Sequence, residues 1–424
     1  MLSLKYIREN LDIVRSSLSK KQSNINIDEI IILDADRRKY LKEVEALRSK
    51  KNATSEIIAG LKKDGQTAEL EVKSMQLLSV EIKNIEKDLK EIEDLIQKKI
   101  YYIPNLVHQS VPEGKDEKEN VLIKEWGEKP ELDFKILDHV EIGENLQLFD
   151  FKRAVKMAGA SFPLYTGLGA RLERALINFM LDFHVEEHGY KELLPPFLSN
   201  RQAMQNTGQL PKFEDDMYSI PEDHLFCIPT AEVPLTNFHQ GEIISESEFP
   251  LKYTAYTACF RREAGSYGQD TKGLSRVHQF NKVELVKFVH PHNSYLELDL
   301  LVKDAEGIMQ ALGLHYRIIE LCSGDLSFSA AKCYDIEVWS PADNKYLEVS
   351  SCSNFEDFQS RRSNIRFRNK TNGKGEFVHT LNGSGVATPR LMIALLESFQ
   401  QADGSINLPE ALHPYFKNVS IPIA

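Results

Sequence analysis

One run of regularly spaced apolar residues constrains the fold of this sequence more than any other feature. Its members are Met75, Leu78, Ile82, Ile85, Leu89, Ile92 and Ile96. They follow one another at alternating intervals of three and four residues, which is the spacing of the apolar seam in a coiled coil. The positions between them are mostly Lys, Glu, Asp, Asn and Ser. The pattern predicts a long helix that buries a narrow stripe against a second helix.

The second helix is predicted upstream. A similar register is formed by Ile30, Leu33, Tyr40, Val44, Leu47, Ile58 and Leu61, with interruptions at Arg37, Lys51 and Thr54. Residues 62–69, KKDGQTAE, separate the two patterns and contain an Asp-Gly turn signal. Two helices joined by a short turn form an antiparallel hairpin, and legs of roughly 35 residues would each extend about 50 Å.

The role of this hairpin stays open on these residues alone. Such a pattern is typical of a coiled coil that mediates dimerisation or acts as a spacer. Lys50, Lys51, Lys62 and Lys63 near its tip would also allow contacts with phosphate groups. A solvated helix face carries lysines as well, so the charges do not decide between these roles.

The character of the sequence changes after residue 103. The segment IPNLVHQSVPEGKDEKENV, residues 103–121, combines prolines, a glycine and a charged run, as domain boundaries commonly do. Beyond it, apolar alternation and helical patterns are mixed. We therefore expect an α+β protein with an N-terminal domain over residues 1–103, its helical arm at about 27–101, a linker over 104–120 and a larger domain over 121–424.

Composition limits the compartment and the partners. The five cysteines are scattered and form no CxxC pair, which favours a reducing, cytoplasmic location. No segment approaches the roughly 20 apolar residues that span a bilayer, so we expect no membrane association. The formal net charge of -11 argues against indiscriminate nucleic-acid binding, although it allows a local basic face.

A local basic face is predicted in the stretch CFRREAGSYGQDTKGLSRVHQF, residues 259–280. The residues before and after it alternate as two strands, and GSYGQDTKG between them is typical of a flexible loop. In a strand, loop and strand of this kind, Arg261 could pair with a phosphate and Phe280 could offer a face to a base. The alternative is an exposed hairpin with ordinary surface charges.

A second candidate for anion binding is LNGSGVATPRLMIALLESFQ, residues 381–400. Gly383 and Gly385 permit close backbone approach, and an amphipathic helix with Arg390 in its first turn follows them. The amino-terminal end of a helix favours an anion. Because the glycine spacing matches no phosphate-binding motif, such a stretch on its own is more often a tight packing turn than a ligand site.

Carboxylates in strand-like runs form the third signal. Glu232 lies in IPTAEVPLTN, Glu284 in KVELVKF and Glu348 in YLEVSSCSNF. A buried carboxylate is costly unless it is paired or bound to a cation. Several glutamates beside hydroxyl groups indicate a Mg²⁺ site and a pocket for a small ligand with an ammonium group, whereas a single one is usually a salt-bridge partner.

These stretches together resemble a known family. GYKELLPPF, FRREAGSYGQDTKGLSRVHQFNKVE and GSGVATPRLMIALLE occur in this order and resemble motifs 1, 2 and 3 of class II aminoacyl-tRNA synthetases. TAEVPLTN, CSGDLSFSAAKCYDIEVWSP, EVSSCSNFEDFQSRR and the N-terminal hairpin are similar to the bacterial form of the seryl-tRNA synthetase family. The resemblance covers essentially the whole chain. It implies a catalytic domain built on an antiparallel sheet flanked by helices.

The resemblance also implies roles for individual residues. Serine binding is implied for Thr230, Ala231, Glu232, Arg261, Glu284, Thr380 and Ser384. ATP binding is implied for Arg261, Arg262, Glu263, Phe280, Glu348, Val349, Ser350, Ser351 and Arg390. Of these, Arg261, Glu263 and Arg390 are the implied catalytic residues, Glu348 and Ser351 the implied Mg²⁺ ligands, and Pro196 lies at the implied dimer interface.

Some positions depart from the family or stay open. Pro389 stands before Arg390 where a glycine is expected, and a proline in the first helical turn is tolerated. Arg262 could be a second phosphate contact or a surface residue, and Lys272 and Arg276 receive no role. The sequence has no cysteine or histidine cluster of the kind used by zinc-dependent relatives, so no zinc is expected.

The activity implied by the resemblance is that of a homodimeric serine–tRNA ligase. Serine and ATP would give seryl-adenylate, and serine would then pass to tRNA(Ser), and to tRNA(Sec) where one exists. The arm would hold the tRNA. Two alternatives are a paralogue that charges a carrier protein, which the unbroken arm pattern disfavours, and a coiled-coil interaction protein with a degenerate catalytic body, which the retained arginines and glutamates disfavour.

Overall fold

The computed structural model describes residues 1–264 and 272–423. The chain divides into two compact units, one formed by Leu2–Ser19 and Ser23–Pro104, the other by Met1, Lys20–Gln22 and the residues from Asn105 onward. In the described part of the chain, no helix combines the length and the apolar character needed to cross a bilayer.

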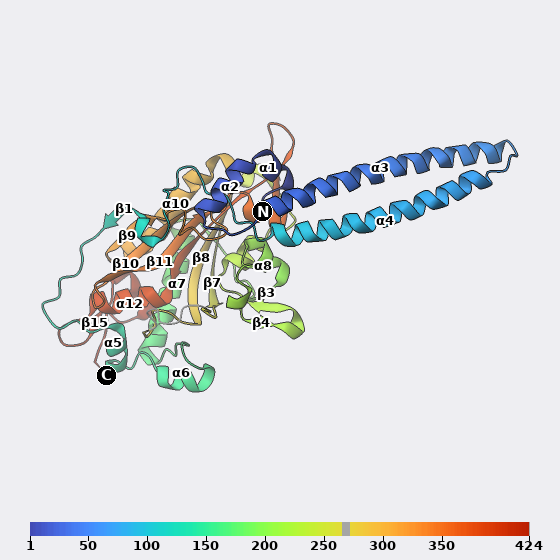
Figure 1. The fold of residues 1–424 in the computed structure, drawn as a ribbon. Coiled ribbons are helices and arrows are strands. Elements are labelled where there is room, and N and C mark those ends of the chain that lie inside the picture. The colour runs from blue at the N-terminus through green and yellow to red at the C-terminus, as the bar shows by residue number, and fades with distance from the viewer. Residues whose placement is uncertain (265–271, 424) are drawn as a thin grey trace. The chain divides into compact units, whose positions relative to one another are not determined.

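The smaller unit is helical. Its helices are α1 (Leu4–Glu9), α2 (Leu11–Lys20), α3 (Ile27–Lys63) and α4 (Glu69–Ile100). The long helices α3 and α4 run side by side as the predicted antiparallel hairpin (Figure 1). Val44, Leu47, Ile82 and Ile85 form a buried cluster between them. The seam predicted from the spacing of the apolar residues is therefore confirmed.

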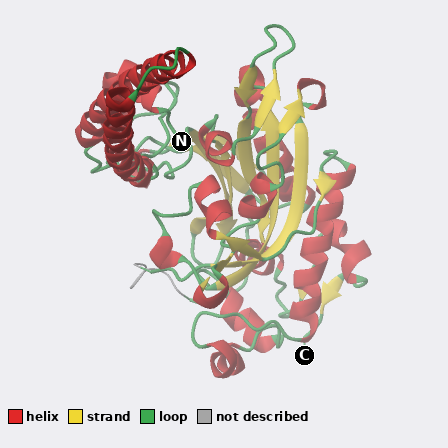
Figure 2. Cartoon of the chain, turned by 90° about the vertical axis from the view of Figure 1, so that its right-hand side faces the viewer, coloured by secondary structure: helices red, strands yellow, loops and turns green. Residues whose placement is uncertain are grey.

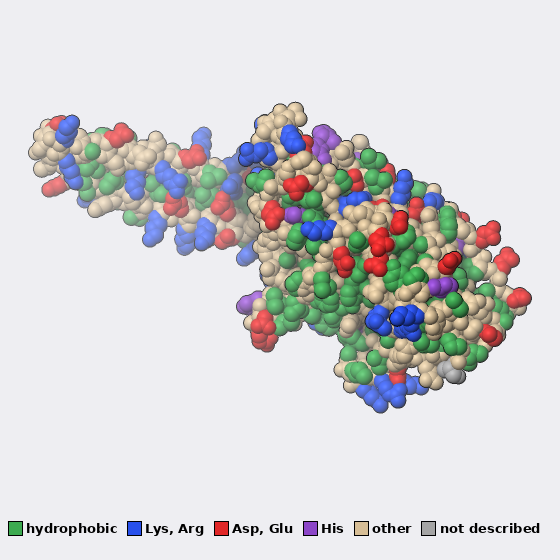
Figure 3. All heavy atoms as spheres, turned by 180° about the vertical axis from the view of Figure 1, so that it is seen from behind, with side chains coloured by type: hydrophobic (Ala, Val, Ile, Leu, Met, Phe, Trp, Pro, Cys, Tyr) green, Lys and Arg blue, Asp and Glu red, His purple; other side chains and the backbone are tan. Residues whose placement is uncertain are grey.

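Ion pairs flank this seam on its exposed sides. Arg37 bonds to Glu93 at 2.9 Å, Arg48 to Glu86 at 2.6 Å, and Lys99 to Glu29 at 2.6 Å. Side chains of both signs are interspersed along the surface of the arm (Figure 3). Exposed pairs of this kind contribute little stability, so the buried apolar residues hold the two helices together.

The larger unit is built on a mostly antiparallel sheet (Figure 2). Its strands lie in the order β1 (Val121–Trp126), β9 (Tyr316–Glu320), β10 (Lys332–Ser340), β11 (Lys345–Asn354), β14 (His379–Ala387), β8 (Gln279–Val289), β7 (Leu251–Phe260) and β2 (Lys191–Glu192). Only the β2–β7 pair among these is parallel. The prediction of an antiparallel sheet flanked by helices is confirmed.

One face of this sheet is covered by helices. Residues of α7 (Gly167–Glu186), α10 (Ser294–Ala311) and α12 (Thr388–Phe399) share a single apolar core with the sheet. Shorter helices are α5 (His139–Asn145), α6 (Phe151–Ala158), α8 (Arg201–Thr207), α9 (Glu232–Asn237), α11 (Phe358–Ser363) and α13 (His413–Phe416). Small sheets are formed by β13 (Gly375–Phe377), β12 (Arg366–Arg368) and β6 (Ile243–Ser245), by β3 (Leu198–Asn200), β5 (Leu225–Cys227) and β4 (Ser219–Ile220), and by β15 (Ile406–Asn407) and β16 (Ser420–Ile421).

The arm seam can be tested by shortening one buried side chain. Ile82 is 7% exposed, and its replacement in Ile82→Ala should cost the arm roughly 2 kcal/mol. We expect faster hydrogen exchange of the α3 and α4 amides in the intact protein, because local opening becomes less costly. Val80→Ala, at a position 61% exposed on the same helix, is the control. Equal exchange in the two variants would contradict the seam.

Candidate active site

The face of the sheet opposite α7, α10 and α12 carries polar side chains of the cavity. Strand β8 shows the division clearly, because Val283 and Leu285 join the core beneath the helices while Lys282 and Glu284 point to the other side. Lys282 and Glu284 form a buried ion pair there, and Lys282 donates to Thr230 Oγ1 at 2.8 Å. The strand thus places a buried pair of opposite charges on this face.

Strand β14 repeats this arrangement. A Cβ on Gly383 would lie 2.8 Å from Cys352 Sγ, and one on Gly385 would lie 2.7 Å from His184 Nε2 on α7. The two glycines therefore permit close packing of the strand within the core. Asn382 and Ser384 face the opposite side, where Asn382 donates to Glu284 Oε1 at 2.9 Å. Of the two interpretations of this stretch, packing explains the glycines.

A bulge in β11 brings two oxygen ligands to one face. Residues three apart in a regular strand point to opposite faces. The pairing of β11 with β10 shifts register at Val349, where Glu337 pairs with Glu348 and Ile336 with Ser350. This extra residue turns Glu348 and Ser351 to the same side, and both line the same cavity.

That cavity has a volume of about 480 Å³. Among its lining residues are many of those predicted from the sequence: Thr230, Glu232, Arg261, Glu263, Phe280, Glu348, Val349, Ser351, Ser384 and Arg390. They come from β8, β11, β14, α9, α12 and the connecting segments. Residues more than 150 positions apart in the sequence are therefore collected around one space.

Other predicted residues do not line the cavity. Ala231, Glu284 and Thr380 are buried behind it, and Ser350 donates to the Ser384 carbonyl at 2.6 Å. Arg262 is exposed, with its guanidinium 5.9 Å from the ring centre of Tyr218. Pro196 is exposed after β2, near Leu194, which is 80% exposed.

The strand, loop and strand predicted around Arg261 is a hairpin of β7 and β8. The Arg261 amide donates to the His278 carbonyl at 2.8 Å, and its guanidinium lies 5.1 Å from the Phe280 ring centre. Glu263, with a left-handed φ of 51°, accepts a bond from Arg276 at 2.7 Å. Of the predicted flexible loop GSYGQDTKG, residues 265–271 lie outside the described part of the chain.

Glu232 lies on a helix, so the expectation of a strand around it is wrong. The Thr230 hydroxyl accepts a bond from the Glu232 amide at 3.1 Å, and α9 begins there. Such local side-chain bonds compete with strand pairing. Pro234 falls in the first turn, where a helix needs no N–H donor.

The Glu232 carboxylate is buried and its ionisation is perturbed. Burial, followed by the nearby negative charge of Glu284, raises the pKa of Glu232 to about 7. The Gln359 amide opposes this shift by donating to Glu232 Oε1 at 2.6 Å. Gln359 also accepts from the Thr380 hydroxyl at 2.7 Å. A chain of hydrogen bonds therefore connects Thr380 to the carboxylate.

Arg390 projects from the first turn of α12. The helix begins at Thr388 and includes Pro389 in that turn, so the proline leaves the arginine in place. Arg390 donates to the Glu348 carbonyl at 2.9 Å and lies 3.4 Å from its carboxylate. Arg390, for which the resemblance implies phosphate binding, thus contacts Glu348, for which it implies metal binding.

The sequence did not point to three polar residues of this site. Lys282 and Asn382 line the cavity and both contact Glu284, and Gln359 connects Glu232 with Thr380. Lys282 and Asn382 were detectable in principle, because each lies two residues from a predicted site residue and so shares its face of a strand. Gln359 lies on α11 and had no local signal.

Comparisons with known proteins find relatives of both units of the chain. Residues 1–107 match the seryl-tRNA synthetase N-terminal domain, and residues 212–399 match the tRNA synthetase class II core domain of the G, H, P, S and T type. The chain is 53% identical to a serine–tRNA ligase of Syntrophobacter fumaroxidans and 54% identical to one of Desulfosudis oleivorans, each over 99% of both chains. A crystal structure of seryl-tRNA synthetase from Pyrococcus horikoshii complexed with ATP superimposes with a TM-score of 0.94 at 36% identity, covering 100% of both chains.

Identity at this level extends over both units and includes the cavity. A relative that shares half of its residues along the full length shares the fold and the reaction class. The chain therefore belongs to the seryl-tRNA synthetase family, the class II aminoacyl-tRNA synthetases that ligate serine to tRNA.

Proposed function

We propose that the cavity holds serine and ATP side by side and forms seryl-adenylate. The observation that carries this proposal is the convergence of two arginines, a pair of oxygen ligands and a buried carboxylate on one space. Arg261 enters it from the position directly after β7, Arg390 from α12, and Glu348 with Ser351 from β11. Cations suit a triphosphate, while a buried carboxylate suits an ammonium group.

Serine would bind where the buried polar groups cluster. Glu232 would pair with the ammonium group, while Thr230, Ala231 and Glu284 shape the pocket around it. Ser384 and Thr380 would serve the substrate hydroxyl, with Gln359 orienting Thr380. A pocket built to bond a hydroxyl rejects alanine, because alanine would leave buried polar groups without partners.

ATP would occupy the end of the cavity bounded by the hairpin. Phe280 would stack on the adenine and Glu263 would border it, while Arg261 would bridge the serine carboxylate and the α-phosphate. Arg390 would reach the γ-phosphate, and Val349 and Ser350 would support this region from β11. Arg262 would be a peripheral phosphate contact.

The donor set also fits a divalent cation. The bulge in β11 presents a carboxylate and a hydroxyl on one face, and Mg²⁺ prefers oxygen ligands of this kind. Glu348 and Ser351 would hold the ion, which would supply charge stabilisation for the triphosphate. We propose no zinc in this site.

Adenylate formation then needs positioning more than acid or base. A serine carboxylate oxygen, already anionic, attacks the α-phosphorus while the bond to pyrophosphate breaks. Arg261 and Arg390 stabilise the charge that develops. In the second step a ribose hydroxyl at the tRNA end attacks the adenylate carbonyl, and AMP leaves.

The other assignments concern partners. Residues 1–103 would hold tRNA(Ser), and tRNA(Sec) where one exists, through the arm, whose exposed lysines near the tip include Lys50, Lys62 and Lys63. Residues 104–120 would be a linker and residues 121–424 the catalytic domain. Exposed Pro196 and Leu194 would meet a second copy of the chain, giving a cytoplasmic homodimer.

Replacing the hairpin arginine tests the assignment of the cavity. Arg261→Ala should lower serine-dependent ATP–pyrophosphate exchange by at least about a hundredfold, because a charge partner of the transition state is lost. Arg368→Ala, at an exposed position on β12, is a matched control and should behave like the unmodified enzyme. Near-normal exchange in Arg261→Ala would remove this residue from the chemistry.

The ionisation of Glu232 predicts a pH dependence of serine binding. With a pKa of about 7, the carboxyl is mostly neutral at pH 6 and mostly charged at pH 8. Only the charged form attracts an ammonium group, so the KM for serine should rise about tenfold from pH 8 to pH 6. The KM for ATP measured in the same exchange assays is the internal reference.

Glu232→Gln completes this test, because an amide does not titrate in that range. Its KM for serine should be high and nearly constant from pH 6 to pH 8. A wild-type KM for serine that does not change over this range would contradict the role of Glu232.

Deleting residues 30–96 and bridging the ends with a short turn separates the two activities. Exchange should persist in the folded variant, because the cavity is formed by the larger unit. Charging of tRNA should be lost. Loss of both activities in a folded variant would contradict the proposed division of labour.

A further inference from the structure

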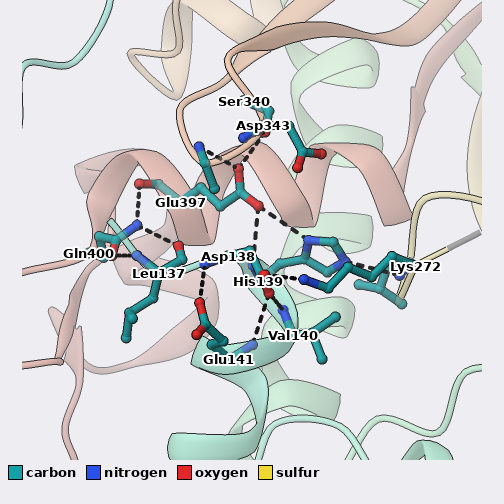
Figure 4. A network of polar contacts seen from close by, with 12 residues as sticks. Leu137, Asp138, His139, Val140, Glu141, Lys272, Ser340, Asp343, Glu397 and Gln400 are labelled. Carbon is teal, nitrogen blue, oxygen red and sulfur yellow. Dashed lines mark hydrogen bonds and ion pairs between the residues drawn. The ribbon is translucent and has the colours of Figure 1, made fainter. Parts of the chain in front are cut away.

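A buried histidine and carboxylate lie behind the cavity, outside the residues assigned above. His139, at the start of α5, is 2% exposed, and Glu397, near the end of α12, is fully buried. Glu397 Oε1 accepts bonds from the His139 amide at 3.1 Å and lies 3.2 Å from His139 Nδ1. Glu397 Oε2 accepts from the Ser340 hydroxyl at 2.5 Å (Figure 4). Both carboxylate oxygens are therefore satisfied.

The other ring nitrogen of His139 fixes the state of the imidazole. The Leu274 amide donates to His139 Nε2 at 3.2 Å. Because an amide can only donate, Nε2 must be the unprotonated acceptor, and Nδ1 carries the proton that goes to Glu397. The imidazole thus connects the Glu397 carboxylate with the backbone that returns from the 265–271 segment.

The neighbouring residues of this backbone are held to the same place. Lys272 forms an ion pair with Asp138, the residue before α5 (Figure 4). Gly273 has a φ of +57°, and a Cβ on it would lie 2.6 Å from Val140 Cγ2 and closer still to the His139 ring. We call residues 272–277 the return limb. Its first three residues are attached to the amino-terminal end of α5.

The rest of the return limb lines the cavity. Residues 274–277 are all lining residues, and Arg276 donates to Glu263 at 2.7 Å. Arg390 Nε donates to the Ser275 carbonyl at 3.4 Å. Arg390 and Glu397 are seven residues apart, about two turns of α12, and so lie on a similar side of that helix. The helix therefore holds the limb at two points, directly through Arg390 and through His139 by Glu397.

We propose that His139 and Glu397 are positioning residues for ATP. By holding the Leu274 amide, they fix the positions of Ser275 and Arg276 along the nucleotide part of the cavity. Arg276 in turn fixes the position of Glu263 through their ion pair. This inference rests on the proposed binding of ATP in that part. It concerns ATP rather than serine, because the serine residues other than the shared Arg261 lie on α9, on β8, on β14 and in the segment just before α9, and they have no contact with the limb in the bonds described above.

His139→Asn tests the proposal. The asparagine amide can replace Nδ1 as a donor to Glu397, but it leaves the Leu274 amide without its acceptor. We expect the KM for ATP in serine-dependent exchange to rise about tenfold, the effect of one lost buried hydrogen bond, with the KM for serine and the kcat nearly unchanged. Gly273→Ala is a second variant. Its added Cβ should displace the limb although the side chains of His139 and Glu397 are kept, and we expect it to raise the KM for ATP as well.

His315→Asn is the matched control. His315 is also buried and bonded through both nitrogens, to the Gly127 carbonyl at 3.1 Å and to the Tyr346 hydroxyl at 2.9 Å, and it is not a lining residue of the cavity. It should lower the melting temperature without changing the KM for ATP.

The outcomes separate the ideas. An unchanged KM for ATP in both His139→Asn and Gly273→Ala overturns the positioning role. So does a parallel rise of both KM values, since that indicates general destabilisation. If His139→Asn does not fold, Gly273→Ala decides. Absence of serine-dependent exchange in the unmodified protein would overturn the proposed function itself.

Discussion

The site depends on strands that present different chemistry to their two faces. In β8, Val283 and Leu285 are buried in the core shared with α7, α10 and α12, and Lys282 and Glu284 are thereby fixed on the opposite face. A buried ion pair contributes little net stability and becomes costly when one partner is lost. The helix-covered core therefore supplies the stability, and the polar face is free to be arranged for binding.

The interactions on that face form one connected set. Glu284 accepts bonds from Thr230, Asn382 and Lys282, and its charge acts on Glu232. Groups in such a low-dielectric network polarise one another, so their contributions are not independent. Substrate serine would enter this set as one more charged partner, and its ammonium group would relieve the repulsion between the two carboxylates.

The sequence predicted the parts of the structure that depend on local pattern. The α3–α4 seam follows from spacing, and the β7–β8 hairpin from alternation around a glycine-rich loop. The helix at Glu232 was missed because one bond, donated by the Glu232 amide to the Thr230 hydroxyl, overrides the apparent alternation. Gln359 and His139 act through partners 127 and 258 residues away, and no local pattern encodes contacts of that length.

The bulge at Val349 has a consequence for sequence comparison. In an ordinary strand, a carboxylate and a hydroxyl three positions apart could not serve one ligand. Glu348 and Ser351 face the same side of β11 only while the extra residue is present. Replacing the Val349 side chain and deleting one residue there therefore have different effects on the strand. A deletion would invert every later side chain of the strand, whereas a substitution leaves the alternation intact. Insertions and deletions should therefore be far rarer in this strand than in the surface loops of related chains.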